Sequence, residues 1–337
     1  MLIPNWLSRL TTRRSSRSRR NRRSPHNRLV AQPSLARTPE FLEDRTLLTS
    51  LTFDDAAELM RGETVTSATI VTHGFQSSNS GGDSLLSLAQ AIRNRANLQN
   101  GASAEAWLLD YDLKGNPVDG VFDTEDSVLP TASGLIGDVV LLFDWAMESN
   151  ESSAGWGEAA GDALFATLVG LGFVNPAAGT AVPLHFIGHS FGAAVTSEAI
   201  ERLAAYSVPV DQVTFLDPHD FDQGILPVDG SQRLFELGIP QTPDDPSHSY
   251  GATIWDNVTF ADVYYQTEAA PDGRPIPGAY NLNVTDHPLV TSPNSHSDVW
   301  DDFYLTTVQD QNTAIGYIFS RIVGGSRPIP QFYGSGQ

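Results

Sequence analysis

The stretch VPLHFIGHSFGAAVTSEAIERLA, residues 182–204, decides the fold, because an apolar run of strand length leads straight into a run with helical spacing. The first part is nearly continuously apolar, as expected of a parallel strand covered on both faces, and its apolar residues are Val182, Leu184, Phe186 and Ile187. From Phe191 onward the apolar residues recur every three or four positions and mark one buried helical face, namely Val195, Ala199, Ile200, Leu203 and Ala204. The stretch therefore predicts a strand, a tight turn and a helix, with Ser190 at the apex of the turn.

The turn carries the pattern GxSxG, formed by Gly188, Ser190 and Gly192. A strand that turns directly into a helix strains the backbone of the apical residue, and side chains two positions before and after it would collide. Glycine is therefore needed at both flanking positions. The small Ala193 and Ala194 let the helix pack closely and aim its positive N-terminal end at the serine. The alternative is a structural glycine-rich turn with an inert serine.

The segment LHFIGHSFGAAV resembles the α/β-hydrolases, and more narrowly the lipases of the pancreatic or bacterial triacylglycerol type. The resemblance covers motifs between residues 66 and 304. It implies an α/β fold in which a mostly parallel central sheet is flanked by helices on both faces, with inserted loops or a cap. It also implies a serine hydrolase that cleaves carboxylic esters through a Ser-His-Asp triad and an acyl-enzyme, with Ser190 as the nucleophile.

Charge is distributed unevenly along the 337 residues: residues 1–45 hold 11 of the 20 basic residues and 3 of the 40 acidic ones. The remainder carries 9 basic and 37 acidic residues, a formal charge of −28. Such a body repels nucleic acid and anionic lipid head groups, which argues against a nucleic-acid partner. Calcium binding is an alternative, but no segment shows the spaced carboxylates of an EF-hand loop, and a solvated acidic surface is favoured.

The chain contains no cysteine, which excludes disulfides and thiol nucleophiles and leaves serine as the natural nucleophile. No apolar run reaches the roughly 18 to 20 residues of a membrane span. A length of 337 residues suits one large domain, residues 49–337, preceded by a leader. The oligomeric state does not follow from the sequence.

Residues 1–48 are predicted to form a disordered, arginine-rich leader outside the fold. Within it, PEFLEDRTLLTS (residues 39–50) resembles the LExRxLLS motif near the start of many exported bacterial surface proteins. The usual apolar signal core is missing, so the expectation of a secreted or surface location rests on that resemblance.

Residues 64–72 are rich in β-branched side chains and predict a strand that runs into His73-Gly74-Phe75. The His-Gly pair resembles the oxyanion loop of lipases, which makes the backbone N–H groups of Phe75 and Phe191 the candidate oxyanion donors. An ordinary turn is the alternative. A helix with apolar residues from Leu85 to Ile92 is expected next.

A strand is predicted at residues 105–113, followed by an inserted loop at residues 115–133. Apolar stripes predict helices at residues 135–147 and 157–171. After the nucleophile helix, residues 212–216 form the next predicted strand, and a further strand is predicted at residues 258–267, whose ADVYYQT resembles the lipase strand before the catalytic histidine. Residues 219–255 are rich in proline, aspartate and glycine and predict a cap over the site. A terminal helix is predicted at residues 313–322.

Asp217 ends the strand in the triplet LDP, which resembles the lipase triplet that holds the catalytic acid. A buried carboxylate that is hydrogen-bonded to the imidazole fixes the tautomer of the histidine and stabilises the imidazolium. The alternative is a turn aspartate at a strand end. His219, Asp220 and Asp222 follow, and a polar loop is favoured over a metal site; no metal or cofactor is expected.

Two histidines compete for the role of the base, His287 in VTDHPLV and His296 in SPNSHSDVWDDFY. His296 is favoured, because a histidine eight residues before a tyrosine resembles the lipase segment that carries the base, whereas His287 precedes a proline and is suited to closing a turn. Phe75, Phe191 and Trp300 flank the candidate residues and favour lipid-like or aliphatic esters, although aromatic residues there are also compatible with a core.

The expectation is thus a secreted or surface-attached carboxylic ester hydrolase with Ser190, His296 and Asp217 as its triad. Two alternatives remain: an amidase, peptidase or thioesterase on the same triad, and a catalytically inactive hydrolase-like domain that binds at a surface.

Overall fold

The structure is a computed structural model, and it describes residues 51–61, 64–76, 85–101, 104–112, 121–122, 127, 136–145, 149, 154–220, 251–290 and 295–329. The predicted leader, residues 1–48, lies outside the described residues, as does most of the predicted cap, residues 221–250. None of the described helices is both long and apolar enough to cross a membrane.

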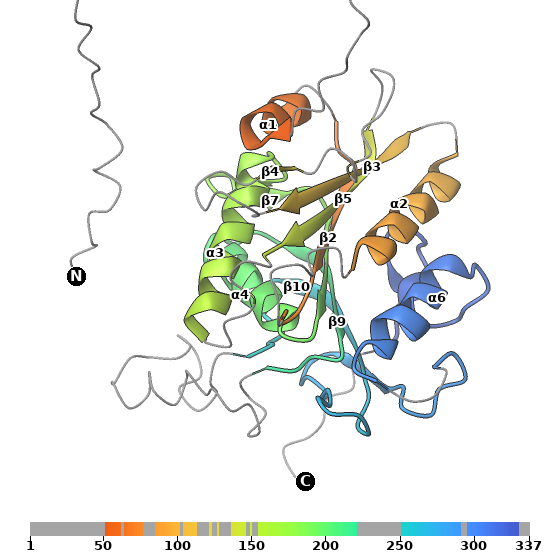
Figure 1. Cartoon of the computed structure of the whole chain (residues 1–337). Coiled ribbons are helices and arrows are strands. Elements are labelled where there is room, and N and C mark those ends of the chain that lie inside the picture. Colours follow the sequence, from red (N-terminus) through yellow and green to blue (C-terminus); the bar gives the residue numbers. More distant parts are fainter. Residues whose placement is uncertain are drawn as a thin grey trace, which may run out of the picture. The chain divides into compact units, whose positions relative to one another are not determined.

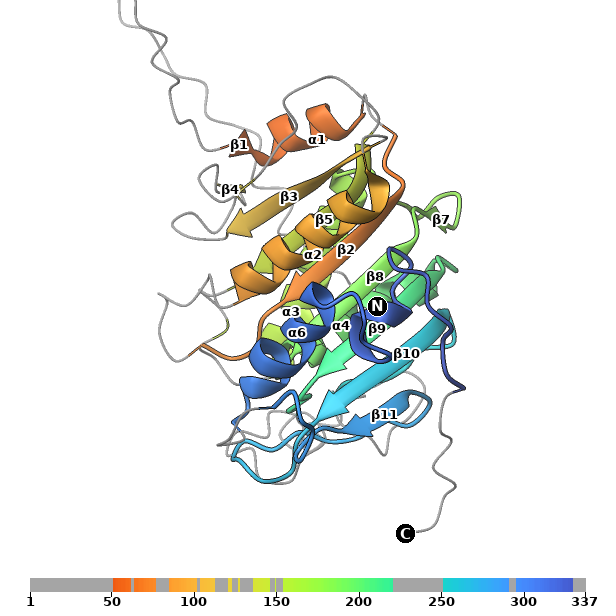
Figure 2. The ribbon, with the colours of Figure 1, turned by 90° about the vertical axis from the view of Figure 1, so that its right-hand side faces the viewer.

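A nine-stranded sheet forms the centre, in the order β1-β4-β3-β5-β2-β8-β9-β10-β11 (Figure 1, Figure 2). The seven strands from β3 to β11 in this order run parallel, whereas β4 pairs antiparallel with β1 and β3. The strands are β1 Leu51–Thr52, β2 Ser67–Thr72, β3 Glu105–Asp112, β4 Val121–Phe122, β5 Ile136–Asp144, β8 Leu184–His189, β9 Val210–Leu216, β10 Val258–Tyr265 and β11 Tyr280–Asn283. A separate two-stranded hairpin joins β6 Val174–Asn175 and β7 Thr180–Ala181.

Helices cover both faces of the sheet, which confirms the predicted α/β class with a mostly parallel sheet. In Figure 1, α3 and α4 lie on one side of the sheet and α2 and α6 on the other. The helices are α1 Phe53–Arg61, α2 Leu86–Asn100, α3 Ala154–Gly170, α4 Gly192–Ala205 and α6 Leu305–Gln309, with a π-helical turn η3 Val299–Tyr304 before α6 and a 3-10 turn η4 Gly316–Phe319 near the end.

Within residues 135–147, which are predicted as a helix, Ile136–Asp144 form strand β5 instead. Val139, Leu141 and Phe143 pack into the core beneath α3 and α4, whereas Val140 and Leu142 pack into the core beneath α2. A strand that is buried on both faces is apolar at every position, so its sequence lacks the two-residue period that would separate it from a helix. The prediction was wrong for this reason.

The predicted terminal helix at residues 313–322 is also wrong, because only η4 forms there. Gly316 has a φ of +75°, and a Cβ at that position would meet the Thr307 hydroxyl, so the chain turns rather than continuing a helix. Other predicted elements are present with shifted ends: the predicted helix at 157–171 is α3, and the predicted strands at 64–72, 105–113, 212–216 and 258–267 are β2, β3, β9 and β10.

The register of the sheet brings the ends of its central strands together. Thr72 of β2 pairs with Gly188 of β8, His189 of β8 pairs with Leu216 of β9, and Leu216 pairs with Tyr264 of β10. Loops that follow the carboxyl ends of parallel strands meet at one edge of the sheet. Residues 73–76, Ser190, Asp217 and Gln266 therefore emerge side by side.

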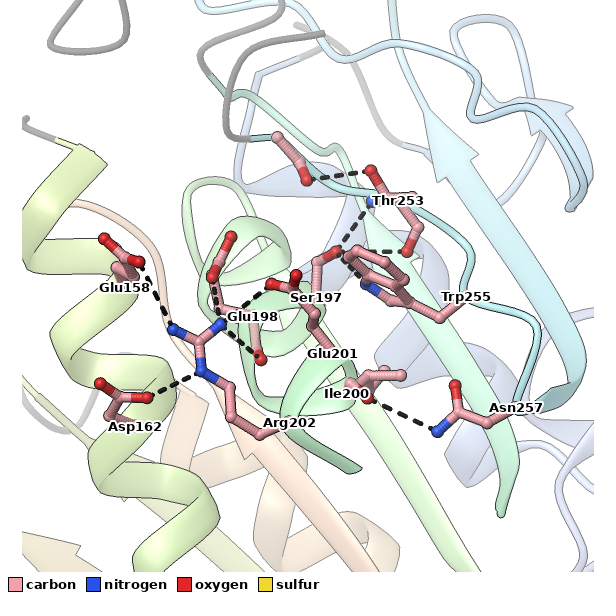
Figure 3. Close-up of polar contacts among 11 residues, drawn as sticks. Glu158, Asp162, Ser197, Glu198, Ile200, Glu201, Arg202, Thr253, Trp255 and Asn257 are labelled. Carbon is pink, nitrogen blue, oxygen red and sulfur yellow. Dashed lines mark hydrogen bonds and ion pairs between the residues drawn. The ribbon is translucent and has the colours of Figure 1, made fainter. Parts of the chain in front are cut away.

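Helix α4 is held on both sides by polar contacts (Figure 3). On one side, Arg202 contacts Glu158 and Asp162 of α3. On the other side, the Ser197 hydroxyl accepts hydrogen bonds from the Thr253 N–H (3.0 Å) and the Trp255 indole N–H (3.1 Å). The chain that leads into β10 is thus anchored directly on the helix that follows Ser190.

Candidate active site

Ser190 lies in a strained turn between β8 and α4. Its φ is 57°, a left-handed value that is rare for residues other than glycine. A Cβ on Gly188 would lie 2.7 Å from the Gly192 carbonyl oxygen, and a Cβ on Gly192 would lie 2.5 Å from the carbonyl oxygens of Thr72 and His73. Both flanking glycines are therefore required by close backbone contacts, which is the geometry of a nucleophile elbow.

The loop after β2 is pressed against Ser190. A Cβ on Gly74 would lie 2.5 Å from the Ser190 Cβ and 2.9 Å from its Oγ. The backbone N–H of Phe75, the next residue, makes no hydrogen bond within the described part of the chain. Phe191, the second candidate donor, occupies the N-cap position of α4, where the helix directs its positive end toward Ser190.

The end of β5 holds this loop in place. The Trp145 indole N–H donates to the His73 carbonyl oxygen (2.9 Å), and the two rings stack with centroids 5.7 Å apart. His73 Nε2 lies 2.9 Å from Asp144 Oδ1, and Gln76 N–H donates to the Ser149 carbonyl oxygen (3.2 Å). The backbone beside Ser190 is thus held rigidly by a neighbouring strand.

Asp217 follows β9 and is fully buried. It also has a left-handed backbone, with a φ of 45°, which is fixed by a hydrogen bond from its N–H to the Tyr264 carbonyl oxygen (2.7 Å). Its carboxylate faces His296, whose Nδ1–H donates to Asp217 Oδ2 at 2.6 Å. The two residues are 79 positions apart in the sequence, so the contact arises from the fold alone.

His296 keeps its other ring nitrogen available. Because Nδ1 carries the proton that faces Asp217, Nε2 of a neutral ring is the unprotonated nitrogen. This atom is buried and has no hydrogen-bond partner among the residues that the structure describes. The His296 carbonyl oxygen lies 3.3 Å from Nε2 of His189, the residue before Ser190, and the two rings are 4.7 Å apart. His296 therefore sits directly against the turn that carries Ser190.

His189 must stay neutral in this position. Burial lowers its pKa well below the ordinary value of 6.5, and the neighbouring His296 lowers the pKa further. A positive charge on His189 would oppose proton uptake by the His296 ring, and a neutral His189 adds no such charge.

The structure places His287 elsewhere. Its N–H donates to the Val284 carbonyl oxygen, its Nδ1 accepts the Leu289 N–H (3.2 Å), and its ring packs edge-on against Phe303. His287 therefore closes a turn and its contacts do not include Asp217.

The polar residues after Asp217 form a structural anchor. Asp220 is buried and accepts hydrogen bonds from Arg274 (2.7 and 3.0 Å) and from the Ala252 N–H (2.6 Å). His219 Nδ1–H donates to the Asp272 carbonyl oxygen at 2.9 Å. Asp222 lies outside the described residues, and within those residues no group of three or more histidine and acidic side chains is arranged to hold a metal ion.

Phe75, Phe191 and Trp300 place aromatic side chains close to the turn of the candidate nucleophile, and Trp156 adds an exposed one on α3. Phe75 is 46% exposed and Trp156, at the start of α3, is 42% exposed. Phe191 is buried beneath α3, because a Cβ on Gly157 would lie 3.1 Å from its ring. The Trp300 ring packs on His189, with centroids 6.4 Å apart. The surface around Ser190 thus has an apolar character.

Two residues of this arrangement were not singled out from the sequence. His189 is an ordinary residue within GHSFG, and Gln266 is the glutamine of ADVYYQT, a segment whose resemblance points only to a strand. No local pattern marks either residue, because both act through contacts with residues distant in the sequence.

Comparison with known proteins adds little to this geometry. No protein-family model matches the chain, and no curated protein matches it closely. Among solved structures, one match is a candidate cell-surface hydrolase from Lactobacillus plantarum WCFS1, which covers 60% of this chain and 68% of that chain. The sequence identity is 10% and the TM-score is 0.33, so this likeness carries no argument about activity.

Proposed function

We propose that the chain is a serine hydrolase of the α/β-hydrolase class that cleaves carboxylic esters, with Ser190 as nucleophile, His296 as base and Asp217 as acid. The observation that carries the proposal is the 2.6 Å hydrogen bond from His296 Nδ1 to the buried Asp217, formed against the strained turn of Ser190. A histidine oriented by a buried carboxylate, beside a serine in such a turn, is the arrangement that nucleophilic acyl transfer requires.

In this mechanism Ser190 Oγ attacks the ester carbonyl carbon, and His296 Nε2 accepts the serine proton. Asp217 stabilises the imidazolium, and the N–H groups of Phe75 and Phe191 hold the oxyanion. The protonated His296 then donates its proton to the leaving alcohol, and water cleaves the acyl-enzyme by the same steps. In the described structure Nε2 has no partner, so the hydrogen bond between Nε2 and the Ser190 hydroxyl has to form when the substrate binds.

The apolar surroundings support an ester with an aliphatic or lipid-like acyl chain. Phe75 exposes apolar area in the loop that contacts Ser190, where an acyl chain would gain about 25 cal/mol for each Å² buried. The resemblance of residues 39–50 to an export motif supports a secreted or cell-surface location. The acidic composition of the remaining chain supports the absence of a nucleic-acid partner.

A fluorophosphonate probe tests the proposal directly, because it labels only an activated serine. Wild-type protein is expected to be labelled on Ser190 and to hydrolyse p-nitrophenyl esters, whereas Ser190→Ala should be neither labelled nor active. Ser207→Ala is the matched control, since Ser207 has the same φ of 57° but lies in the turn after α4. Absence of labelling in the folded wild-type protein would favour the inactive binding domain, and faster cleavage of anilides or thioesters would favour the amidase or thioesterase alternatives.

A further inference from the structure

Gln266 is the first residue after β10 and lies next to Asp217 at the edge of the sheet. Its side chain is almost completely buried. Burial of an amide is costly unless each of its polar atoms is hydrogen-bonded, so the partners of Gln266 show what it holds.

Two of these partners are the oxygens of Asp217. The Gln266 backbone N–H donates to Oδ1 at 2.8 Å, and the side-chain Nε2–H donates to Oδ2 at 3.0 Å. Oδ2 is also the atom that accepts the proton of His296 Nδ1. Gln266 therefore grips both oxygens of the carboxylate that orients the candidate base.

The orientation of the amide follows from its remaining partners. Oε1 accepts the backbone N–H groups of Glu268 (2.9 Å) and Ala269 (2.7 Å), whereas Nε2 faces the carbonyl oxygens of Ala269 (2.9 Å) and Pro271 (3.0 Å). A reversed amide would place its oxygen against a carboxylate and two carbonyl oxygens, and its NH₂ group against two N–H donors. The loop after β10 thus forces Gln266 to present a donor to Asp217.

The surroundings leave the carboxylate no freedom to turn. A Cβ on Gly273 would overlap Asp217 Oδ1, and the Gly273 N–H donates to the Gln266 carbonyl oxygen (3.0 Å). The carboxylate of Asp217 is thus held in place by the donors around it, and the backbone that carries it has a strained, left-handed conformation.

We propose that Gln266 is the positioning residue of the candidate triad, which sets the direction in which Asp217 accepts the proton of His296 Nδ1. The inference rests on the proposed function for its effect on catalysis. The hydrogen bond between His296 and Asp217 can be measured independently, even in a protein that hydrolyses no ester.

The test compares Gln266→Met and Gln266→Glu with the same substitutions at Gln212. Gln212 is a matched control, because it is also a fully buried glutamine whose Nε2–H donates to a buried aspartate, in this case Asp262 at 3.1 Å on the neighbouring strand. All four variants should lower the melting temperature. A role confined to stability would give the same pattern at both positions.

The first readout is the NMR resonance of the His296 Nδ1–H proton, assigned by its loss in His296→Ala. Gln266→Met is expected to shift or broaden this far-downfield resonance at a temperature where the variant is folded, and Gln212→Met is expected to leave it unchanged. An unchanged resonance in Gln266→Met would overturn the proposal, whatever the activity.

The second readout is ester hydrolysis. Gln266→Met should lower kcat by about 100-fold with little change in KM, since a small misplacement of a catalytic group costs about that much. Gln266→Glu regains a donor only when its carboxyl is protonated, so its kcat relative to wild type should fall as the pH rises. If Gln266→Met does not fold, the pH trend of Gln266→Glu still tests the proposal, and the absence of this trend would count against it. A wild-type protein without activity but with the resonance and its expected shift would refute the proposed function and leave the positioning role intact.

Discussion

Gly74 and Ser190 touch so closely that a side chain on Gly74 would displace Ser190: an added Cβ would lie 2.5 Å from the Ser190 Cβ. The contact joins the loop that follows β2 to the turn that follows β8, two neighbouring strands of the sheet. In the proposed mechanism, this contact sets how far the Phe75 N–H lies from the carbonyl group that Ser190 would attack.

Gly74→Ala should therefore impair catalysis more than folding. The added methyl group has to move the loop away from Ser190, and the loss of one oxyanion donor costs about 100- to 1,000-fold in kcat. Steady-state kinetics with p-nitrophenyl butyrate measure the effect, and fluorophosphonate labelling should slow in parallel.

Gly101→Ala is the control for the cost of adding a Cβ to glycine. Gly101 lies at the end of α2 with a φ of 59° and open space around its Cβ position, so its replacement costs about 1 kcal/mol in stability and leaves kcat unchanged. Equal activity of Gly74→Ala and Gly101→Ala would exclude a catalytic role for the loop at residue 74.

The three candidate triad residues should behave as a unit. Ser190→Ala and His296→Ala are each expected to lower kcat by about 10⁴-fold or more, and the double variant should lose little beyond either single one. Asp217→Asn should cost somewhat less, because it disturbs the tautomer of His296 and leaves the attacking pair in place. Burst and steady-state kinetics on one ester measure all four variants.

His287→Ala is the control for the triad, since His287 lies in a turn against Phe303. Its activity should match the wild type within about twofold, as expected of a substitution outside the site. Loss of activity in His287→Ala together with activity in His296→Ala would reassign the base.

The central part of the fold was predictable because its signals are local. The change from a continuous apolar run to helical spacing at Ser190 lies within residues 182–204, and glycine at 188 and 192 has a local steric reason. β5 was not predictable by the same method, because burial on both faces removes its period. α1 and β11 are short, with nine and four residues, and neither was predicted.

The candidate site likewise has one residue that a local pattern predicts and others that depend on contacts distant in the sequence. Ser190 follows from the local pattern, but the choice between His287 and His296 depends on which of them reaches Asp217, and that contact spans 79 residues. Gln266 acts on Asp217 across 49 residues. Such contacts depend on strand order and register, which the sequence pattern does not specify.

A buried polar network beneath η4 should make stability depend on pH in two opposite ways. Burial raises the pKa of Asp262 to about 6 and lowers the pKa of His185 to about 3. Thr214 links them, because its hydroxyl donates to Asp262 Oδ1 (2.7 Å) and lies 2.9 Å from His185 Nε2. The raised pKa of Asp262 lies above its value near 4 in the unfolded chain. Asp262 therefore stabilises the folded state at low pH, and this stabilisation is lost as the pH rises from about 4 to 6. His185 stays neutral in the folded protein but takes up a proton in the unfolded chain near pH 6.5. The folded state is therefore destabilised by His185 as the pH falls below about 6.5.

Asp262→Asn separates the two effects. The variant keeps an oxygen acceptor for Thr214 but no longer titrates, so its free energy of unfolding relative to wild type should rise by about 2 kcal/mol as the pH increases from about 4 to 6. Urea unfolding at a series of pH values measures this difference. A difference independent of pH would show that Asp262 has the same pKa in the folded and the unfolded protein.

Arg202 should stabilise the protein chiefly through Glu198. Arg202 contacts four carboxylates, of Glu158, Asp162, Glu198 and Glu201 (Figure 3), but they differ in exposure. The Glu198 side chain is 7% exposed and that of Asp162 is 67% exposed. Burial raises the pKa of Glu198 to about 7, and Arg202 opposes this rise by stabilising the charged form.

Arg202→Met should therefore cost about 3 kcal/mol of unfolding free energy at about pH 8, because it leaves the Glu198 charge buried without a partner. Adding Glu198→Gln should restore much of the loss, since the uncompensated charge is then gone; Glu198→Gln alone completes the double-mutant cycle that gives the coupling energy of the pair. Asp162→Asn is the matched control: it removes a carboxylate 2.7 Å from the same guanidinium, but one that is exposed, and should cost less than about 1 kcal/mol. Urea midpoints at unchanged m-values measure all four variants.

The cost of Arg202→Met should also depend on pH. Because the pKa of Glu198 is raised, the stabilisation that Glu198 contributes to the fold weakens as the pH rises through about 7, so the cost of Arg202→Met should shrink when the pH is lowered toward 5. A cost that is equal at both pH values, or that Glu198→Gln does not relieve, would show that Arg202 acts through packing between α3 and α4 rather than through the buried charge.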